Sequence, residues 1–427
     1  MWYKYSTMSK TIIFVEHGGV NKEFTLKKAK DFGFKIILAT THPQDLIYQY
    51  VNKDDVLITD TFDAKKLITD AKNFIESKKI KIDAVITFKE SSVIPTSNLA
   101  EALNVKGVGS SAAGRSSQNK RVMRETLRDS GFINQPAFRK INIYDKDFLL
   151  GIKKFPKPCV IKPLFGSSSH GVKKIENNIK IKQDIKDIRE SMKPEDREIF
   201  KNFDGEMLLE EYIDGTVISV DGLVADKKIH FIGSTQFIMG KEPYFQQIAS
   251  FIPPKLDKVT IKECRKLTEE VITILGFDTC GFHCEWRISK AGPMLLEIAA
   301  RTVGGGILLG YEKVTGIDLI NELFMALLGK KVKIDPKNKT CVLHKSVLPD
   351  INQNSQLTFF EGFENISKDK DVWHALKFCD TGDLLLVLPE TPTQLYYYAL
   401  KGKTIEYLLE KSRIIESQVL YKTKKVL

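Results

Sequence analysis

The sequence predicts a multidomain protein of mixed α/β and α+β class, with a Rossmann-like N-terminal layer, a strand-rich central domain and a small α+β C-terminal subdomain. The chain has 427 residues, enough for two or three domains. Residues 11–110 alternate short apolar runs with helical patterns, whereas residues 131–328 show paired strands with glycine turns. A polar, turn-rich segment, 329–339, then precedes the tail. We therefore expect domains at 1–114, 115–330 and 331–427.

The composition is that of a globular chain. Hydrophobic residues make up 42% and charged residues 28% of the sequence, which excludes a disordered or fibrous protein. No apolar stretch approaches the roughly 20 residues that cross a bilayer, so no membrane partner is expected. The N-terminus, Met1 to Tyr5, lacks the layout of a signal peptide, and the sequence therefore predicts a cytoplasmic protein.

The net charge of +11 raises the question of nucleic-acid binding. The basic residues are mostly lysines spread among acids, and no aromatic residues alternate with an arginine-rich stripe. A lysine-biased composition explains the charge more simply, so no nucleic-acid partner is expected. The six cysteines are scattered, as a reducing compartment allows. Cys280 and Cys284 lack a second ligand pair at zinc spacing, which favours packed thiols.

Four apolar runs in the N-terminal layer predict buried parallel strands. They are Thr11 to Val15, Lys35 to Thr40, Val56 to Ile58 and Ala84 to Phe88. Helical patterns between them include 63–78 and 93–104. The first strand runs into Glu16-His17-Gly18-Gly19, which is not the dinucleotide fingerprint. We therefore assign no cofactor to this layer and expect it to form scaffold and one wall of a substrate cleft.

A lysine near a helix start is the first chemical signal. The sequence predicts a helix that opens at Ser116 or Ser117 and ends near Gly131, with Lys120 in its first turn. A cation there opposes the helix dipole at a cost of about 0.3 kcal/mol or more. Lys120 is therefore either screened by solvent or in contact with an anionic ligand.

A glycine- and serine-rich loop gives the strongest local signal. A short apolar strand ends in Lys162, and a second strand begins at Val172. The loop between them offers backbone N–H groups and hydroxyls to a phosphate, with the ammonium of Lys162 at its edge. It is not a Walker A loop, because Val172 follows the last glycine. An ordinary flexible hairpin is the alternative. The loop residues are Gly166, Ser167, Ser168, Ser169, His170 and Gly171.

An apolar run that ends in acids and an aromatic residue follows. The run Met207 to Leu209 continues into Glu210, Glu211, Tyr212 and Ile213. Such a segment can hold a purine by backbone hydrogen bonds between apolar walls, and an edge strand is the alternative. The charged segment 180–201 before it is predicted to form a solvated helix.

Two strands with facing acids give the most informative pattern. Residues 282–288 and 294–299 are joined by a turn, and if the turn centres on Ala291, Glu285 faces Glu297. Carboxylates at that separation repel unless a cation lies between them, and oxygen ligands beside phosphate favour Mg²⁺ (or Mn²⁺). Neutralisation by Arg287 is the alternative. One face is expected to be apolar, with Cys284, Trp286, Ile288, Met294, Leu296 and Ile298, and the other polar, with His283, Glu285, Arg287 and Glu297.

The segment after this hairpin combines a guanidinium with a glycine run. Arg301 is followed by Gly304, Gly305 and Gly306, where the backbone can approach an anion closely. The tail then carries strand candidates at 340–348, 384–388 and 394–399 and a helix candidate at 404–412, which predict a small α+β lid.

In their order along the chain these segments resemble the ATP-grasp carboxylate–amine ligases, and within them the branch of L-amino-acid ligases and carnosine-synthase-like enzymes. The resemblance covers most of the chain and is specific over about 115–330. It implies an ATP-grasp central domain, metal binding by Glu285 and Glu297, and catalytic roles for Arg301, Gly304 and Gly305. The implied ATP-binding residues are Lys120, Lys162, Gly166, Ser167, Ser168, Ser169, His170, Gly171, Glu210, Glu211, Tyr212 and Ile213.

Two positions depart from the family pattern. Val217 stands where the family often has a ribose-binding Glu, and Ala299 stands where it often has an Asn beside the metal. Some branches read E-x-A-A-R as this chain does, so the departures do not imply inactivity.

The resemblance implies an ATP-dependent ligase that activates a carboxylate as an acyl phosphate, passes it to an amine, and releases ADP and phosphate. The alternatives are another acceptor, such as bicarbonate or a thiol, and an ATP-binding protein without turnover. No general base is obvious, although His283 is a candidate. Small-molecule carboxylate and amine substrates are expected but not identified, and a homodimer stays open. Segment 236–254, with Tyr244, Phe245 and Phe251, is a candidate for specificity.

Overall fold

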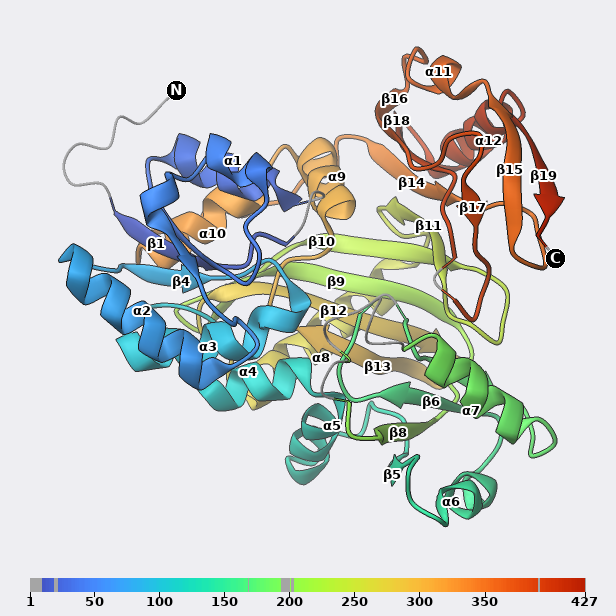
Figure 1. The fold of residues 1–427 in the computed structure, drawn as a ribbon, viewed down its shortest axis with the longest axis horizontal. Helices are drawn as coiled ribbons and strands as arrows, with labels where there is room; N and C mark the ends of the chain where they lie inside the picture. Colours follow the sequence, from blue (N-terminus) through green and yellow to red (C-terminus); the bar gives the residue numbers. More distant parts are fainter. Residues whose placement is uncertain are drawn as a thin grey trace.

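A computed structural model describes residues 10–18, 22–167, 169–192, 200, 203–390 and 392–426. Its largest layers are a parallel N-terminal sheet, a small antiparallel sheet and a long antiparallel sheet (Figure 1). No helix in these ranges is both long and apolar enough to span a bilayer.

The N-terminal sheet has the strand order β3-β2-β1-β4, and all its strands are parallel. Its strands are β1 (Thr11–Val15), β2 (Lys35–Thr40), β3 (Val56–Ile58) and β4 (Ala84–Ile86). Their runs are apolar because helices cover both faces. Helices α2 (Ala64–Lys78) and α3 (Val93–Leu103) pack on one face, and α1 (Phe24–Phe32) and α10 (Leu319–Leu327) on the other. The predicted parallel strands are confirmed.

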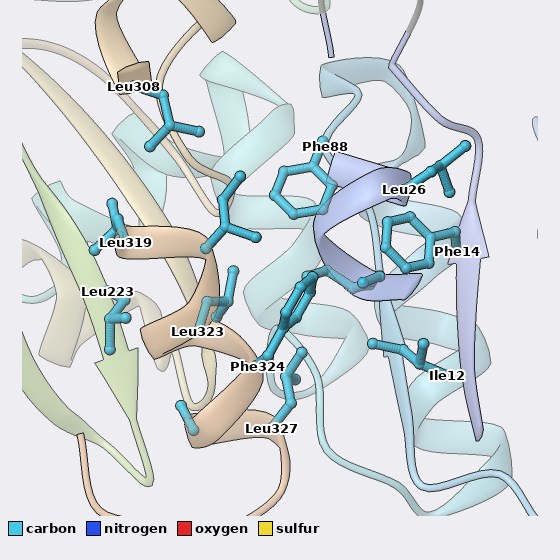
Figure 2. Close-up of a cluster of buried hydrophobic side chains, with 14 of the residues drawn as sticks. Ile12, Phe14, Leu26, Phe88, Leu223, Leu308, Leu319, Leu323, Phe324 and Leu327 are labelled. Carbon is cyan, nitrogen blue, oxygen red and sulfur yellow. The ribbon is translucent and has the colours of Figure 1, made fainter. Parts of the chain in front are cut away.

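Helix α10 joins this layer to the long sheet. In Figure 2, its side chains Leu323 and Phe324 lie in a cluster with Phe14 and Phe88 of the N-terminal layer and Leu223 of the long sheet. Each fully buried Leu or Phe contributes about 1.5–3 kcal/mol to stability. One continuous core therefore fixes the N-terminal layer against the rest of the molecule.

The small sheet has the order β5-β8-β6-β7. Its strands are β5 (Phe138–Asn142), β6 (Cys159–Pro163), β7 (Lys173–Ile175) and β8 (Glu206–Glu211). Helices α6 (Phe148–Lys154) and α7 (Ile181–Glu190) pack on it. Because β8 lies between β5 and β6, the edge-strand alternative for this segment was wrong. The helix expected over 180–201 ends at Glu190, and 193–199 and 201–202 lie outside the described residues.

The long sheet has the order β13-β12-β9-β10-β11-β14-β18-β16. Its first five strands are β9 (Thr216–Ala225), β10 (Lys228–Met239), β11 (Gln247–Ile252), β12 (Cys280–Ser289) and β13 (Gly292–Ala299). Helix α8 (Lys258–Leu275), which the sequence analysis did not predict, packs with their apolar side chains. Cys264, Cys280 and Cys284 are free and buried in this core, which confirms packed thiols.

The tail continues this sheet. Strand β14 (Cys341–Val347) pairs with β11, and β18 (Tyr396–Gly402) and β16 (Val372–Lys377) follow it. A three-stranded sheet of β15 (Ser355–Glu361), β17 (Leu384–Leu385) and β19 (Leu420–Lys425) lies beside it, with α11 (Phe363–Ile366) and α12 (Ile405–Glu416). The hydrogen bonds between β11 and β14 cross the boundary expected at 330, and the division itself stays a prediction.

The helix expected from Ser116 to Gly131 is in fact two helices. Helix α4 (Ser111–Gln118) ends at Asn119, and α5 (Lys120–Asp129) begins there. Asn119 has an extended backbone, and its side chain accepts hydrogen bonds from the N–H groups of Arg121 and Val122. Asparagine is a favoured N-cap because it satisfies these orphan donors, and Lys120 is therefore the first residue of a helix.

Candidate active site

A cavity of about 630 Å³ brings the predicted residues together. Its walls come from the small sheet, from β9 to β13 of the long sheet and from the N-terminal layer. The predicted residues that line it are Lys120, Lys162, Gly166, Ser167, Ser169, His170, Glu210, Glu211, Tyr212, Ile213, Glu285, Glu297, Arg301, Gly304 and Gly305. Gly171 is not among its lining residues, and Ser168 lies outside the described residues.

Lys162 is the last residue but one of β6, lines the cavity and is held by a neighbouring carboxylate. Its Nζ lies 2.6 Å from Oε2 of Glu210 on β8, and Nε of the fully buried Arg124 lies 2.8 Å from Oε1 of the same carboxylate. Burial alone raises the pKa of Glu210, but Arg124 and Lys162 bring it below its ordinary value. The Glu210 side chain therefore positions Lys162.

Lys120 connects the loop after β6 to a predicted metal ligand. Its Nζ donates to the carbonyl of Gly166 at 3.1 Å and lies 3.3 Å from Oε2 of Glu297. Its backbone N–H donates to the carbonyl of Leu164 at 2.9 Å. The start of α5 is thereby fixed to the loop, with the ammonium of Lys120 in the wall of the cavity.

The loop has the backbone that its glycines suggest. Gly166 and Gly171 have φ values of +136° and +71°, conformations that L side chains rarely adopt. A Cβ at Gly171 would lie 2.5 Å from Sδ of Met192. Gly171 thus allows close packing with the segment after α7, while Gly166, Ser167, Ser169 and His170 line the cavity.

Apolar and aromatic side chains line the end of the cavity beyond β8. Tyr212 stacks with Phe245 at a centroid distance of 6.4 Å, and the Arg287 guanidinium lies 5.6 Å from both ring centroids. Arg287 also donates from Nη1 to the carbonyl of Ile213 at 2.9 Å. Val217 and Phe237 line the same cavity. These side chains form an aromatic and apolar part of the cavity lining.

Of the aromatic residues proposed for specificity, one lines the cavity. Phe245 does so, whereas Phe251 packs in the core beneath β14. The hydroxyl of Tyr244 instead donates to Asp187 at 3.4 Å.

Glu285 and Glu297 lie directly opposite each other on β12 and β13, as predicted. Glu285 Oε1 accepts hydrogen bonds from His283 Nε2 at 3.1 Å and from Gln247 Nε2 at 3.2 Å. Although burial alone raises the pKa of Glu297, Lys120, Lys162, His283 and Arg301 lower it to about 2. Glu297 is therefore an ionised carboxylate at any ordinary pH.

The register of this hairpin differs from the expected one. The turn is Lys290-Ala291, between the paired Ser289 and Gly292, and a bulge at Leu296 restores the pairing of the two glutamates. As a result Leu295 packs in the core and Leu296 lines the cavity. The expectation that Met294 and Leu296 lie on the apolar core face was wrong, because Met294 pairs with Arg287 and the sequence does not reveal the extra residue of a bulge.

The two carboxylates suit a metal that also binds phosphate. Among the described residues, no group of three or more His, Cys, Asp or Glu side chains forms a protein-only metal site. Mg²⁺ is commonly held by one or two carboxylates together with substrate phosphates and water. The donor set of Glu285 and Glu297 therefore fits a metal that arrives with a nucleotide.

His283 lies between two carboxylates. Its Nδ1 lies 2.6 Å from Oδ1 of the buried Asp221, and its Nε2 faces Glu285. Burial alone lowers the pKa of His283, but Asp221 and Glu285 raise it to about 10. A ring that is protonated at neutral pH has no lone pair to accept a proton, which argues against His283 as a general base.

Arg301 lines the same cavity. Its Nε lies 2.5 Å from Oε2 of Glu90, and its Nη1 donates to the carbonyl of Thr302 at 2.9 Å. Helix α9 (Gly305–Thr315) begins just beyond it, and its N-cap Gly304 has no side-chain cap. A Cβ at Gly304 would meet no atom within 4 Å, so the N-terminus of α9 opens onto free space.

The sequence analysis did not identify which residues of the N-terminal layer line the cavity. Lys22, Phe88, Lys89 and Glu90 line the cavity, so the expected cleft wall is confirmed. Burial and Arg301 lower the pKa of Lys22 to about 7, against the opposing effect of Glu90. The position of Glu90 after β4, at the carboxyl edge of a parallel sheet, was the available signal.

Comparisons with family models match two parts of the chain. A model described as an ATP-grasp domain matches residues 155–309, and one described as an ATP-grasp N-terminal domain matches residues 26–105. These two ranges contain most of the cavity-lining residues described above.

The proteins similar to this chain include two curated proteins and one solved structure. Alanine–anticapsin ligase of Bacillus subtilis is 25% identical over 260 residues, which cover 57% of this chain and 54% of that protein. Carnosine synthase 1 of Mus musculus is 23% identical over 342 residues, which cover 75% of this chain and 40% of that protein. The chain thus spans about half the length of the curated relatives that it matches. The crystal structure of an L-amino acid ligase from Bacillus licheniformis has the same fold, with a TM-score of 0.80 at 18% identity over 98% of this chain and 100% of that one.

Proposed function

The chain belongs to the ATP-grasp superfamily, and from this premise we propose that it is an ATP-dependent ligase that joins a carboxylate to an amine. One observation carries the proposal. The opposed carboxylates of Glu285 and Glu297 share one cavity with the cations of Lys120, Lys162 and Arg301. This combination suits a reaction in which a carboxylate, itself an anion, must approach a triphosphate.

ATP is proposed to lie between the small sheet and β12–β13. The adenine is proposed to lie against Tyr212, Phe245 and Leu296, with the N–H of Ile213 as its backbone donor, because the N–H groups of Glu211 and Tyr212 donate to the carbonyls of Ala137 and Pro158. Lys162, Lys120 and the N–H groups of Gly166, Ser167 and Ser169 then meet the phosphates, since such groups bind anions well. Glu285 and Glu297 would hold Mg²⁺ (or Mn²⁺), which when bound neutralises phosphate charge and polarises the γ-phosphoryl group.

The reacting carboxylate is proposed to bind Arg301 and the N-terminus of α9. A carboxylate oxygen attacks the γ-phosphorus, the bond to the ADP oxygen breaks, and an acyl phosphate forms. The amine nitrogen then attacks the carbonyl carbon, the bond to phosphate breaks, and the proton that the nitrogen loses passes to the released phosphate. Arg301, Lys120 and the backbone of Gly304 and Gly305 stabilise the negative charge that develops in both steps.

Amino acids are the proposed substrates. The names of the relatives refer to alanine and to L-amino acids, and the end of the cavity near Arg301 offers groups of both signs. Glu90 suits an ammonium group, while Lys22 and Arg301 suit carboxylates. A zwitterionic substrate would thus find a partner for each charge.

An ADP-release screen over pairs of amino acids, with mass detection of the amide, tests the proposal. ADP release that depends on both partners, with one amide and one phosphate per ADP, is the expected result. Trapping with hydroxylamine and then varying the acceptor distinguishes an amine from bicarbonate or a thiol. Tight ATP binding with no ADP across the whole panel would instead favour a binding protein, the alternative suggested by Val217 and Ala299.

A further inference from the structure

Asp221 is a buried carboxylate in the middle of β9 that has no part in the function proposed above. Its exposed fraction is 0%. Burying a charge is costly unless hydrogen bonds compensate it. Its oxygens accept from Ser219 Oγ at 2.5 Å, from the Tyr311 hydroxyl at 2.6 Å, and face His283 Nδ1 at 2.6 Å. Two of these partners, His283 and Tyr311, connect Asp221 to segments that line the cavity.

The first connection runs to the predicted metal site. His283 lies opposite Asp221 in the register of β12 and β9. With Nδ1 held by Asp221, the ring is oriented so that Nε2 lies 3.1 Å from Oε1 of Glu285. A ligand carboxylate that is itself hydrogen-bonded keeps its orientation, and such partners strongly affect metal affinity.

The second connection runs to helix α9. Tyr311 is fully buried on this helix, whose first residues line the cavity. A Cβ at Gly233 would lie 2.6 Å from Cε1 of Tyr311, so the absence of a side chain there makes room for the ring. The Tyr311 hydroxyl also lies 2.8 Å from Oγ1 of Thr235. These contacts fix the rotation of α9 and the place of its N-terminus.

We infer that Asp221 is a positioning residue that holds Glu285 through His283 and helix α9 through Tyr311. This inference rests on the proposed function, which assigns the metal site and the carboxylate site. The metal site and the carboxylate site are then anchored to one buried oxygen pair, which keeps their spacing constant. Transfer between two bound groups is sensitive to displacements of about 1 Å, so a rigid common anchor favours the reaction.

Four variants test this. His283→Asn retains an amide within reach of Asp221 and removes the donor to Glu285, Tyr311→Phe removes only the hydroxyl, and Asp221→Asn removes the charge. Thr268→Val is the matched control. It deletes a buried hydrogen bond of 3.0 Å from Trp286 Nε1 to Thr268 Oγ1, in the core that packs against β12, the strand of His283. The readouts are Mn²⁺ affinity in the presence of ADP, by electron paramagnetic resonance, and hydrogen exchange of residues 304–312, by mass spectrometry.

The expected pattern separates the two connections. His283→Asn weakens Mn²⁺ binding about 10- to 100-fold and leaves exchange in α9 unchanged. Tyr311→Phe accelerates exchange in α9 and leaves Mn²⁺ affinity unchanged. Asp221→Asn weakens Mn²⁺ binding and accelerates exchange in α9, and Thr268→Val changes neither readout.

Wild-type values of both readouts in Asp221→Asn would overturn the inference, and so would equal effects of His283→Asn and Tyr311→Phe on both readouts. If Asp221→Asn does not fold, the other two variants still decide. Both readouts need only ADP and metal, so a failed ligase screen would count against the proposed function and not against this anchor.

Discussion

Lys162 and Glu210 form a buried ion pair in the wall of the cavity, with 2.6 Å between Nζ and Oε2. They lie on the neighbouring strands β6 and β8. Glu210 is also bound by Arg124, so two cations share one carboxylate and the group keeps a net positive charge. This net positive charge on buried side chains is complementary to a phosphate group.

Lys162→Met is expected to weaken ATP binding about 10- to 100-fold, since a hydrogen bond to a charged group contributes about 1.5–3 kcal/mol. The fold should persist because Glu210 keeps its bond to Arg124. Calorimetric titration with a non-hydrolysable ATP analogue measures the loss. The exposed Lys180→Met is the control, and equal affinities of the two variants would contradict the assignment.

Nucleotide affinity is expected to fall as the pH rises above about 8. Burial, Arg124 and Lys120 lower the pKa of Lys162 to about 8, against the opposing effect of Glu210, and only the protonated form binds phosphate well. Because its pKa is lowered, Lys162 loses its proton at a lower pH in the folded state than in the unfolded state. The contribution of Lys162 to unfolding free energy therefore rises between about pH 8 and pH 10.5.

Dissociation constants of ADP measured from pH 6.5 to 9.5 test this titration. The fall in ADP affinity above pH 8 should disappear in Lys162→Met. An identical fall in that variant would assign the titration to another group.

Glu297→Gln is expected to lower turnover about a hundredfold or more, since metal polarisation contributes several kcal/mol to catalysis. Mn²⁺ affinity in the presence of ADP should fall with it. The change also leaves Lys120 without its carboxylate partner, 3.3 Å away in the native protein. Glu270→Gln, at an exposed position on α8, is the control. Wild-type rates in Glu297→Gln would show that the metal assignment is wrong.

Arg301→Lys is expected to raise the KM of the carboxylate substrate about 10- to 100-fold and to leave ATP affinity unchanged. Arginine bonds Glu90 through Nε and Thr302 through Nη1, and a lysine cannot reproduce this fork. Steady-state kinetics with each substrate varied in turn measure the effect. A rise in the KM of ATP instead would place Arg301 at the nucleotide.

ATP and 2′-deoxyATP are expected to be used with kcat/KM values within about threefold of each other. Val217, at the position where the resemblance implies a ribose-binding carboxylate, lines the cavity without a hydrogen-bonding group. A hydrogen bond between a hydroxyl and a carboxylate would contribute about 1.5–3 kcal/mol, or about 10- to 100-fold in discrimination. A preference for ATP above tenfold would mean that another residue holds the ribose.

Much of the site could be predicted from the sequence because its signals are local. Alternation along a strand assigns residues to faces, so the polar face of the 282–299 hairpin and the pairing of Glu285 with Glu297 were foreseen. The strand that ends at Lys162 and the loop after it are likewise defined within a few residues. The first residue of α5 was misplaced only because Asn119 breaks the helical pattern without a proline or glycine.

Local pattern by itself therefore determined the motifs, their order and the side of each strand that carries them. Only the tertiary structure decided that Glu90 and Lys22 from the N-terminal layer and Leu296, through a bulge, complete the cavity, and that Asp221 lies opposite His283. Those placements follow from the packing of α10 between two sheets and from the register of β9 with β12. The free energies that set them come from contacts between residues far apart in the chain, which no local pattern records.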